Sequence, residues 1–143
     1  MNSKIFIQGA IPGEFIATSI AKHQRKTTIG AHNIFLGQVR ADQIEGREVI
    51  GIDYETYQDM AERIIQEIRE YAIQKYQLTC LHIFHSIGKV RTGEICFFVM
   101  ASSKSRAQVY AATEDVVDKV KEGVPIFGKE WVGEEDYYWK QNI

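Results

Sequence analysis

Cysteine and proline are both scarce in this chain of 143 residues, with two of each. The cysteines, Cys80 and Cys96, lie inside apolar runs, and no C-x-x-C pair occurs. A disulfide scaffold, a thioredoxin-like redox motif and a paired-cysteine zinc motif are therefore excluded. Both thiols are expected to be reduced core groups of a cytoplasmic protein. They are expected to be weak nucleophiles, because burial in apolar strands raises the pKa of a thiol.

Long apolar runs and an excess of one charge are also lacking. No segment is long and uncharged enough to span a membrane, and the N-terminus has no signal-peptide pattern. The net charge of −2 lacks the strong basic excess of a general nucleic-acid-binding protein. Neither a membrane nor a nucleic acid is therefore expected as a partner.

The composition is that of an ordinary globular protein, 45% hydrophobic and 25% charged, without a repeat, linker or low-complexity tract. A chain of this length can bury one core, so residues 1–143 are expected to form a single domain.

The order of the predicted elements indicates the fold class. Apolar periodicity predicts three helices, at residues 13–23, 58–76 and 104–122, the last capped by Ser102-Ser103. Strand patterns occur at residues 4–8, 28–39, 48–57, 79–87, 94–101, 124–131 and 137–139, and residues 40–47 are predicted as an exposed loop. These elements predict the α+β class, with a mixed, mostly antiparallel sheet.

The segment Lys121–Glu130 is more apolar than an ordinary solvated loop and reads Lys-Glu-Gly-Val-Pro-Ile-Phe-Gly-Lys-Glu. Pro125 cannot donate a backbone hydrogen bond and helps to end the preceding helix. Lys121 is therefore expected in the last helical turn and Lys129 beyond it, with both ammonium groups at the rim of one pocket. The alternative is a helix C-terminus with a dipole-compatible lysine and a buried exit strand.

Two further cationic motifs lie where elements meet. Ser102–Arg106 joins a strand to a helix, where free backbone N–H groups and a guanidinium suit a phosphate; simple capping is the alternative. Phe35–Arg40 ends a strand in an arginine, which either contacts a ligand or merely marks the strand end.

The candidate cations come from distant parts of the sequence: Arg40, Arg106, Lys121 and Lys129. If they converge, they would suit a phosphate-bearing small molecule. A lysine crowded by other cations loses its proton more easily and can act as a base or nucleophile. If they lie far apart, an ordinary interaction module with dispersed charges is the alternative.

The histidines offer no metal-binding pattern. His82 and His85 lie three apart on a predicted strand and so face opposite sides, and His23 and His32 have no partner spacing. The chain also lacks a nucleophile-elbow glycine pattern and a glycine-rich phosphate loop. Neither a metal nor a cofactor is therefore expected.

Taken together, the segments from about Ile34 to Trp139 resemble the large, catalytic subunit of molybdopterin synthase. The shared motifs are Phe35–Arg40, Tyr54–Tyr57 with Met60-Ala61, His85–Gly88, Ser102–Arg106 and Lys121–Glu130. Their order and spacing in one chain carry the resemblance.

The resemblance implies a sulfurtransferase of molybdenum cofactor biosynthesis with a hammerhead-like α/β fold. Members of the family form a homodimer that binds two copies of a small ubiquitin-like sulfur carrier, giving a heterotetramer. The carrier's C-terminal Gly-Gly tail, activated as a thiocarboxylate, enters a pocket of the large subunit. Two sulfur atoms then pass in succession to cyclic pyranopterin monophosphate and form the dithiolene of molybdopterin.

The resemblance also assigns residues. Lys121 matches the first pocket lysine of the family and is expected to be the main catalytic residue, through proton transfer and stabilisation of the developing anion. Arg40 and Arg106 match substrate-contacting arginines. The remaining expected substrate-binding positions are Gln38, Val39, Ser105, Gly128 and Glu130.

Three departures from the family pattern bear on the site. Ser105 stands where the family has a histidine, and Gly128 stands where it has its second catalytic lysine. The flexibility of Gly128 is expected to let Lys129 take over that role. Many relatives continue into a basic tail that helps to complete a neighbouring protomer's pocket, for which Lys140 is the late cation available.

These departures leave two alternatives to a working synthase. One is a catalytically impaired relative that keeps the dimer and the carrier-binding interface. The other is a regulatory domain that senses a phosphorylated metabolite with the same cationic pocket.

Overall fold

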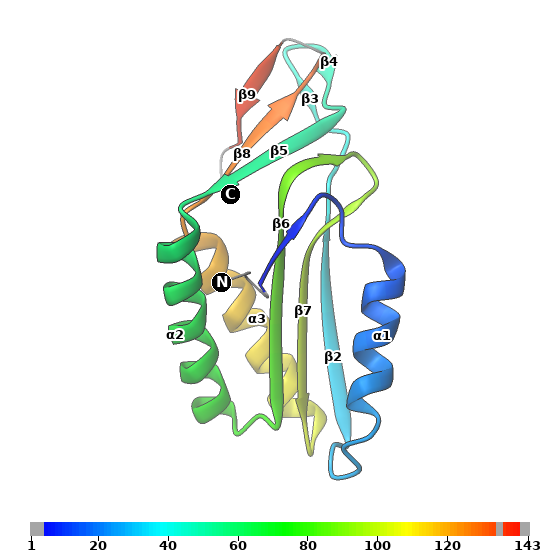
Figure 1. Cartoon of the computed structure of the whole chain (residues 1–143), viewed down its shortest axis with the longest axis vertical. Coiled ribbons are helices and arrows are strands. Elements are labelled where there is room, and N and C mark those ends of the chain that lie inside the picture. Colours follow the sequence, from blue (N-terminus) through cyan, green and yellow to red (C-terminus); the bar gives the residue numbers. More distant parts are fainter. Residues whose placement is uncertain (1–4, 134–135, 141–143) are drawn as a thin grey trace.

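The computed structural model describes residues 5–133 and 136–140. Within these residues the chain forms three helices and nine strands (Figure 1). In chain order they are β1 (Phe6–Gln8), α1 (Gly13–His23), β2 (Ala31–Gln38), β3 (Gln43–Ile44), β4 (Arg47–Glu48), β5 (Gly51–Thr56), α2 (Gln58–Tyr76), β6 (Cys80–Arg91), β7 (Ile95–Ser103), α3 (Arg106–Gly123), β8 (Ile126–Trp131) and β9 (Tyr137–Trp139).

Seven of the described strands form one sheet in the order β2-β7-β6-β5-β8-β9, with β1 added to β6. Every pairing in it is antiparallel except that of β1 with β6. β6 belongs to both halves of the sheet, since its residues 80–85 pair with β7 and its residues 88–91 pair with β5. In Figure 1, β5, β8 and β9 accordingly form a smaller upper sheet across the end of the larger one. The predicted α+β class with a mostly antiparallel sheet is confirmed.

The larger half of the sheet is covered on both faces. Phe97, Val99 and Ala101 of β7 lie in the main core with apolar residues of α2 and α3. The alternate residues Phe98 and Met100 pack in a second cluster with residues of α1. Successive side chains of a strand point to opposite faces, so β7 has apolar residues at nearly every position.

The predicted bounds of the first two helices are confirmed, at Gly13–His23 and Gln58–Tyr76. The predicted start of the third helix is wrong, because α3 begins at Arg106 and its N-cap residue is Ser105. Ser102 and Ser103 continue β7, where they pair with β2 and are buried. None of the helices in the described residues is long and apolar enough to cross a membrane.

The predicted loop at residues 40–47 contains a two-stranded hairpin instead, formed by β3 and β4. Its turn residues Glu45 and Gly46 have φ angles of 51° and 77°, the left-handed values that a tight hairpin turn requires. β6 also runs past the predicted end at residue 87, through Gly88 to Arg91. Part of the predicted strand at residues 4–8 lies outside the described residues, and β1 begins at Phe6.

The start of β2 lies against the corner that leads into α3. The backbone N–H of Gly30 donates a hydrogen bond to the carbonyl of Ser103 at 3.0 Å. A Cβ atom on Gly30 would collide with the carbonyl oxygen of Lys104. The absence of a side chain at Gly30 therefore lets the backbone before Ser105 and Arg106 pack closely against β2.

Gly30→Ala is expected to lower the free energy of unfolding by about 1–3 kcal/mol, because the backbone at Lys104 must move to admit the methyl group. Gly13→Ala is the matched control, since a Cβ atom there meets nothing within 4 Å. In the first turn of α1 this alanine should be neutral or stabilising by up to about 1 kcal/mol. Urea unfolding of both variants measures the difference. An unchanged midpoint for Gly30→Ala would contradict the proposed close packing.

Candidate active site

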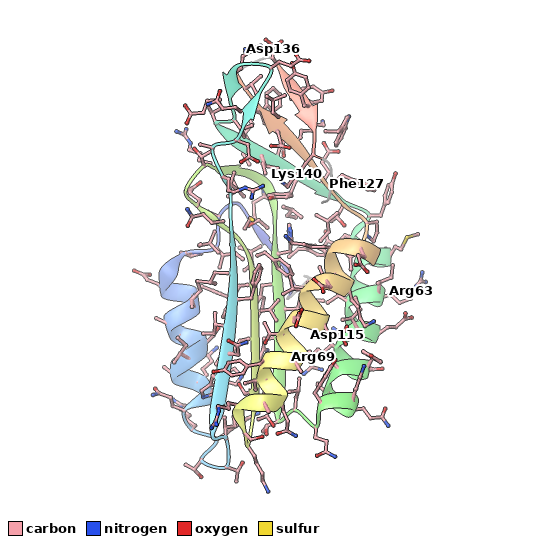
Figure 2. The ribbon with its side chains drawn as sticks, turned by 180° about the vertical axis from the view of Figure 1, so that it is seen from behind. Arg63, Arg69, Asp115, Phe127, Asp136 and Lys140 are labelled. Atoms are coloured by element: carbon pink, nitrogen blue, oxygen red, sulfur yellow. The ribbon has the colours of Figure 1, made fainter. Side chains whose placement is uncertain are left out.

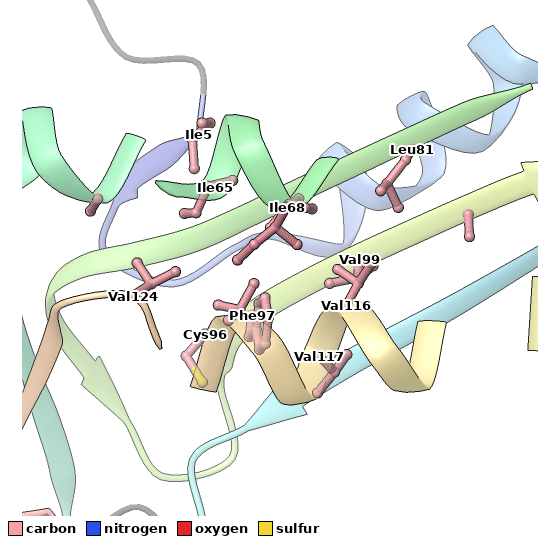
Figure 3. Packing of buried hydrophobic residues seen from close by; sticks show 14 of the residues in the cluster. Ile5, Ile65, Ile68, Leu81, Cys96, Phe97, Val99, Val116, Val117 and Val124 are labelled. Atoms are coloured by element: carbon pink, nitrogen blue, oxygen red, sulfur yellow. The ribbon is translucent and has the colours of Figure 1, made fainter. Parts of the chain in front are cut away.

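Cys96 lies near the junction of the two halves of the sheet, beside Phe97 and close to the end of α3 (Figure 3). Its thiol donates a hydrogen bond to the carbonyl oxygen of Gly37 at 3.4 Å. The thiol also lies close enough to Tyr54 of β5 for the two groups to raise or lower each other's pKa. Residues from β2, β5 and β7 therefore meet at Cys96.

Two lysines act on this thiol from different parts of the chain. Burial raises the pKa of Cys96. A hydrogen bond with Tyr54 and, to a smaller extent, the positive charges of Lys121 and Lys140 partly offset that effect. Lys121 lies in the last turn of α3, and Lys140 lies directly after β9. Both ammonium groups therefore act electrostatically on the Cys96 thiol. Because burial has the larger effect, the thiol stays protonated at neutral pH.

His85 forms another wall of this cluster. Its ring lies edge-on to Tyr54 at 4.9 Å and tilted against Phe97 at 5.3 Å. Burial, with a smaller effect of the Lys121 charge, lowers the pKa of His85 to about 4, against a hydrogen bond to the Ser86 carbonyl that raises it. The imidazole is therefore neutral at neutral pH, and the positive charge beside it belongs to the lysines.

Gly128 of β8 lies opposite Tyr54 in the register of the upper sheet. A Cβ atom on Gly128 would lie 2.9 Å from Ile52 Cγ2 and 3.6 Å from Lys140 Cβ. The backbone N–H of Lys140 donates to the carbonyl of Gly128 at 2.8 Å. Lys140 therefore lies against the position from which a side chain at residue 128 would extend. Figure 2 labels Lys140 near the junction of the two halves of the sheet.

Glu130 lies on the same face of β8 as Gly128, because residues two apart on a strand share a face. It is buried, and its charge contributes to raising the pKa of the Tyr54 phenol, which burial raises most. The neutral phenol of Tyr54 is therefore held between a carboxylate and the Cys96 thiol.

Lys129 extends from the opposite face of β8. Its ammonium forms an ion pair with Glu55 at 2.9 Å and lies 5.3 Å from the ring centres of Tyr137 and Trp139. The hydrogen bond with Glu55 raises the pKa of Lys129. The structure thus pairs Lys129 with groups on the other side of β8 from Tyr54.

The first group of expected substrate-binding residues lies at the end of β2. Val39 is buried in the main core, and its backbone N–H donates to the carbonyl of Glu94 at 3.0 Å. Gln38 and Arg40, on either side of it, are exposed, and Arg40 forms an ion pair with Asp42 at 3.2 Å. Because Gly37 accepts the hydrogen bond of Cys96, this strand end adjoins the Cys96 cluster.

Ser105 and Arg106 lie at the other end of α3 from Lys121. Lys121 follows Arg106 by fifteen positions on a continuous helix, a distance of about 22 Å along its axis. The Ser105 hydroxyl donates to Gln108 Oε1 at 3.0 Å. Within one chain, therefore, Lys121 and the end of β2 are brought together, and Arg106 is not.

Sequence patterns did not point to Cys96, Tyr54, His85 and Lys140 as members of one cluster. Cys96, Tyr54 and His85 lie on three different strands, and Lys140 follows β9, so it is the pairing of the strands that brings them together. A shallow hollow between α2 and α3 is unrelated to this cluster, and its lining includes Glu114, Asp115 and Asp118. Those carboxylates would repel a phosphate.

Comparisons with known proteins identify the family of this chain. The family model of the MoaE protein matches residues 12–123. The molybdopterin synthase catalytic subunit of Oryza sativa subsp. indica is 39% identical over 120 residues, which cover 84% of this chain and 61% of the rice protein. The Pyrococcus abyssi protein of the same name is 34% identical, covering 79% of this chain and 75% of its own. The chain thus spans about three fifths of the length of the rice relative.

Solved structures match almost the whole chain. The crystal structure of molybdopterin synthase from Staphylococcus aureus superposes with a TM-score of 0.81, at 27% identity, over 99% of this chain and 98% of that one. A complex of subunits 1 and 2 of the molybdopterin-converting factor from Helicobacter pylori gives a TM-score of 0.80 at 19% identity, over 96% of this chain and 89% of that one, which shows a common fold. The chain therefore belongs to the MoaE protein family, that of the molybdopterin synthase catalytic subunits.

Proposed function

We propose that this protein is the catalytic subunit of a molybdopterin synthase, a sulfurtransferase that acts in the cytoplasm. It would transfer sulfur from the thiocarboxylate of a small carrier protein to cyclic pyranopterin monophosphate. The observation that carries the proposal is the approach of Lys121 and Lys140 to one buried cluster in a chain of this family. Two ammonium groups at a largely uncharged site suit a phosphate and a tail carboxylate.

The state of the cysteine supports an external source of sulfur. Cys96 is the thiol on which Lys121 and Lys140 act, and burial holds it in the protonated form. A protonated, buried thiol is a poor nucleophile. The sulfur atoms would therefore arrive on the Gly-Gly tail of a ubiquitin-like carrier and not on a cysteine of this chain.

Lys121 is the residue to which we assign the main catalytic role. It lies at the end of α3, beside the neutral imidazole of His85, which cannot itself offer a positive charge at neutral pH. The Lys121 ammonium would stabilise the anion that develops as the thiocarboxylate is attacked and would take part in proton transfer. Gln38, Val39 and Arg40 would bind substrate beside it, with Gly128 and Glu130 as the adjoining wall.

A second copy of the chain would complete the site. Arg106 is about 22 Å along α3 from Lys121, too far to touch the same small substrate. Two copies arranged in opposite directions about a two-fold axis would bring Ser105 and Arg106 of the partner subunit to the Lys121 end. The proposed assembly is therefore a homodimer with two composite sites, each binding one carrier subunit in a heterotetramer.

Two lysines are candidates for the second ammonium group of the site. The sequence-based hypothesis assigns it to Lys129, whose neighbour Gly128 gives the backbone freedom. The position of Lys140 favours a different assignment, because Lys140 lies against Gly128 and acts on Cys96, whereas Lys129 is paired with Glu55. We assign the second positive charge to Lys140.

An impaired relative is the second candidate function. The missing side chain at Gly128 and the hydroxyl of Ser105 in place of a histidine favour it. Such a protein would bind the carrier and the precursor without transferring sulfur. A metabolite-sensing domain would bind the phosphate compound and have no affinity for the carrier.

Lys121→Met is expected to lower product formation at least about 100-fold, because the charge that stabilises the developing anion is lost. The assay combines the purified protein with thiocarboxylated carrier and the pyranopterin precursor. Lys119→Met is the matched control, since Lys119 pairs with Asp115 and lies over Tyr71. Turnover by Lys121→Met within tenfold of the unmutated protein would refute the assignment. Carrier binding without any turnover in the unmutated protein would favour the impaired relative.

Lys140→Met is expected to reduce turnover at least about tenfold, and Lys129→Met less than about threefold, since only the first removes a charge beside Cys96. Both substitutions keep a long apolar side chain and remove one charge, so each serves as the control of the other. The same product assay measures both. The reverse order of effects would return the role to Lys129.

Arg106→Ala and Lys121→Met should each inactivate both sites of a homodimer but complement each other when mixed. In a mixed dimer one site carries both defects and the other carries neither. Unfolding and refolding an equal mixture of the two variants should restore about a quarter of the unmutated activity. No recovery, with mixed dimers detected by mass spectrometry, would show that Arg106 and Lys121 serve the same chain's site or none.

A further inference from the structure

A second group of polar side chains lies at the other end of the larger sheet, away from Lys121. It consists of His23 at the end of α1 and of Cys80 and His82 at the start of β6. The potential ligand atoms of these three residues all lie within 4.8 Å of one another. His23 and Cys80 are buried, and His82 is partly exposed.

The strand geometry explains how the group forms. Residues two apart on a strand share a face, so Cys80 and His82 both point toward α1. The His82 ring stacks on Phe84, and Phe84 packs in the cluster beneath α1. His85 lies on the opposite face of β6, as the sequence predicted, and contacts Tyr54. The partner of His82 is therefore His23, from a helix that precedes it by 59 residues in the chain.

The tautomer of His23 leaves one nitrogen ready to bind a metal. His23 Nδ1 lies 2.6 Å from the carbonyl oxygen of Ser19, which can only accept, so Nδ1 carries the proton. The lone pair of His23 therefore lies on Nε2, which faces His82 Nε2 at 2.7 Å. Histidines that bind metals commonly donate their other ring N–H to a backbone carbonyl in this way, which fixes the orientation of the ring.

The cysteine completes a donor set of two imidazole nitrogens and one sulfur. Lys26 Nζ donates a hydrogen bond to Cys80 Sγ at 2.9 Å. Lys26 is exposed, so its flexible side chain can swing into solvent when a cation takes its place beside the sulfur. The partly exposed ring of His82 provides the entrance.

We propose that His23, Cys80 and His82 form a zinc-binding site that fixes the end of α1 to the start of β6. Two imidazoles and one thiolate are typical zinc ligands, and zinc is four-coordinate in such sites, so a water molecule would take the remaining position. Ligand atoms about 2.0–2.3 Å from one zinc ion lie roughly 3–4 Å apart. The two imidazole nitrogens would separate slightly from 2.7 Å, and all three ligand atoms already lie within 4.8 Å of one another. The site shares no residue with the Lys121 cluster and does not depend on the proposed sulfur transfer.

The test titrates metal-free protein without a histidine tag with Co²⁺, which reports on its ligands by absorption. One Co²⁺ per chain should bind, with the d–d bands of a tetrahedral site and a thiolate-to-cobalt charge-transfer band, and Zn²⁺ should displace it. Cys80→Ser should abolish the charge-transfer band, and His82→Ala should weaken Co²⁺ binding at least about tenfold. Cys96→Ser is the matched control, because it removes the chain's other cysteine and should leave the spectrum unchanged.

A second measurement covers the case in which Cys80→Ser does not fold. The zinc K-edge absorption spectrum of the unmutated protein should show one sulfur at about 2.3 Å and nitrogen or oxygen atoms at about 2.0 Å. Zn²⁺ should also raise the thermal unfolding midpoint of the unmutated protein and not that of His82→Ala. A zinc spectrum without sulfur, no Co²⁺ bands at one equivalent, or loss of the charge-transfer band in Cys96→Ser would each overturn the proposal.

Discussion

The change of partner along β6 is the constraint on which the rest of the structure depends. At Gly88 this strand leaves the larger half of the sheet and begins to pair with β5. Gly88 has a φ of 82°, a left-handed value that favours glycine. His85 precedes this point and Tyr54 pairs with Gly88, so the Tyr54–His85 contact forms where the two halves meet. The cluster around Cys96 is built on that contact.

The length of α3 is the reason why the proposed site would need two chains. A helix of 18 residues keeps its ends about 27 Å apart, and α3 carries Arg106 at one end and Lys121 at the other. The buried residues of α3 pack in the main core against the sheet. The helix therefore does not bend to bring these cations together. The helix that carries Lys121 thus keeps Arg106 away from the Cys96 cluster of the same chain.

Local patterns predicted the local features well. The bounds of α1 and α2 followed from apolar periodicity, and the position of Lys121 in the last turn of α3 followed from Pro125. The start of α3 was missed because strand pairing holds Ser102 and Ser103 in β7, which no local signal reveals. The effect of Lys140 on Cys96 and the contact of His23 with His82 join residues far apart in the chain, and such contacts depend on the assembled sheet.

The position of Lys140 makes the charge of the proposed site depend on an edge strand. Lys140 follows β9, and its backbone N–H is bound to the carbonyl of Gly128 in β8. Lys121, His85 and Tyr54 lie on elements that do not pair with β9. A substitution that weakens the pairing of β9 with β8 would therefore displace the second proposed positive charge and leave the first in place.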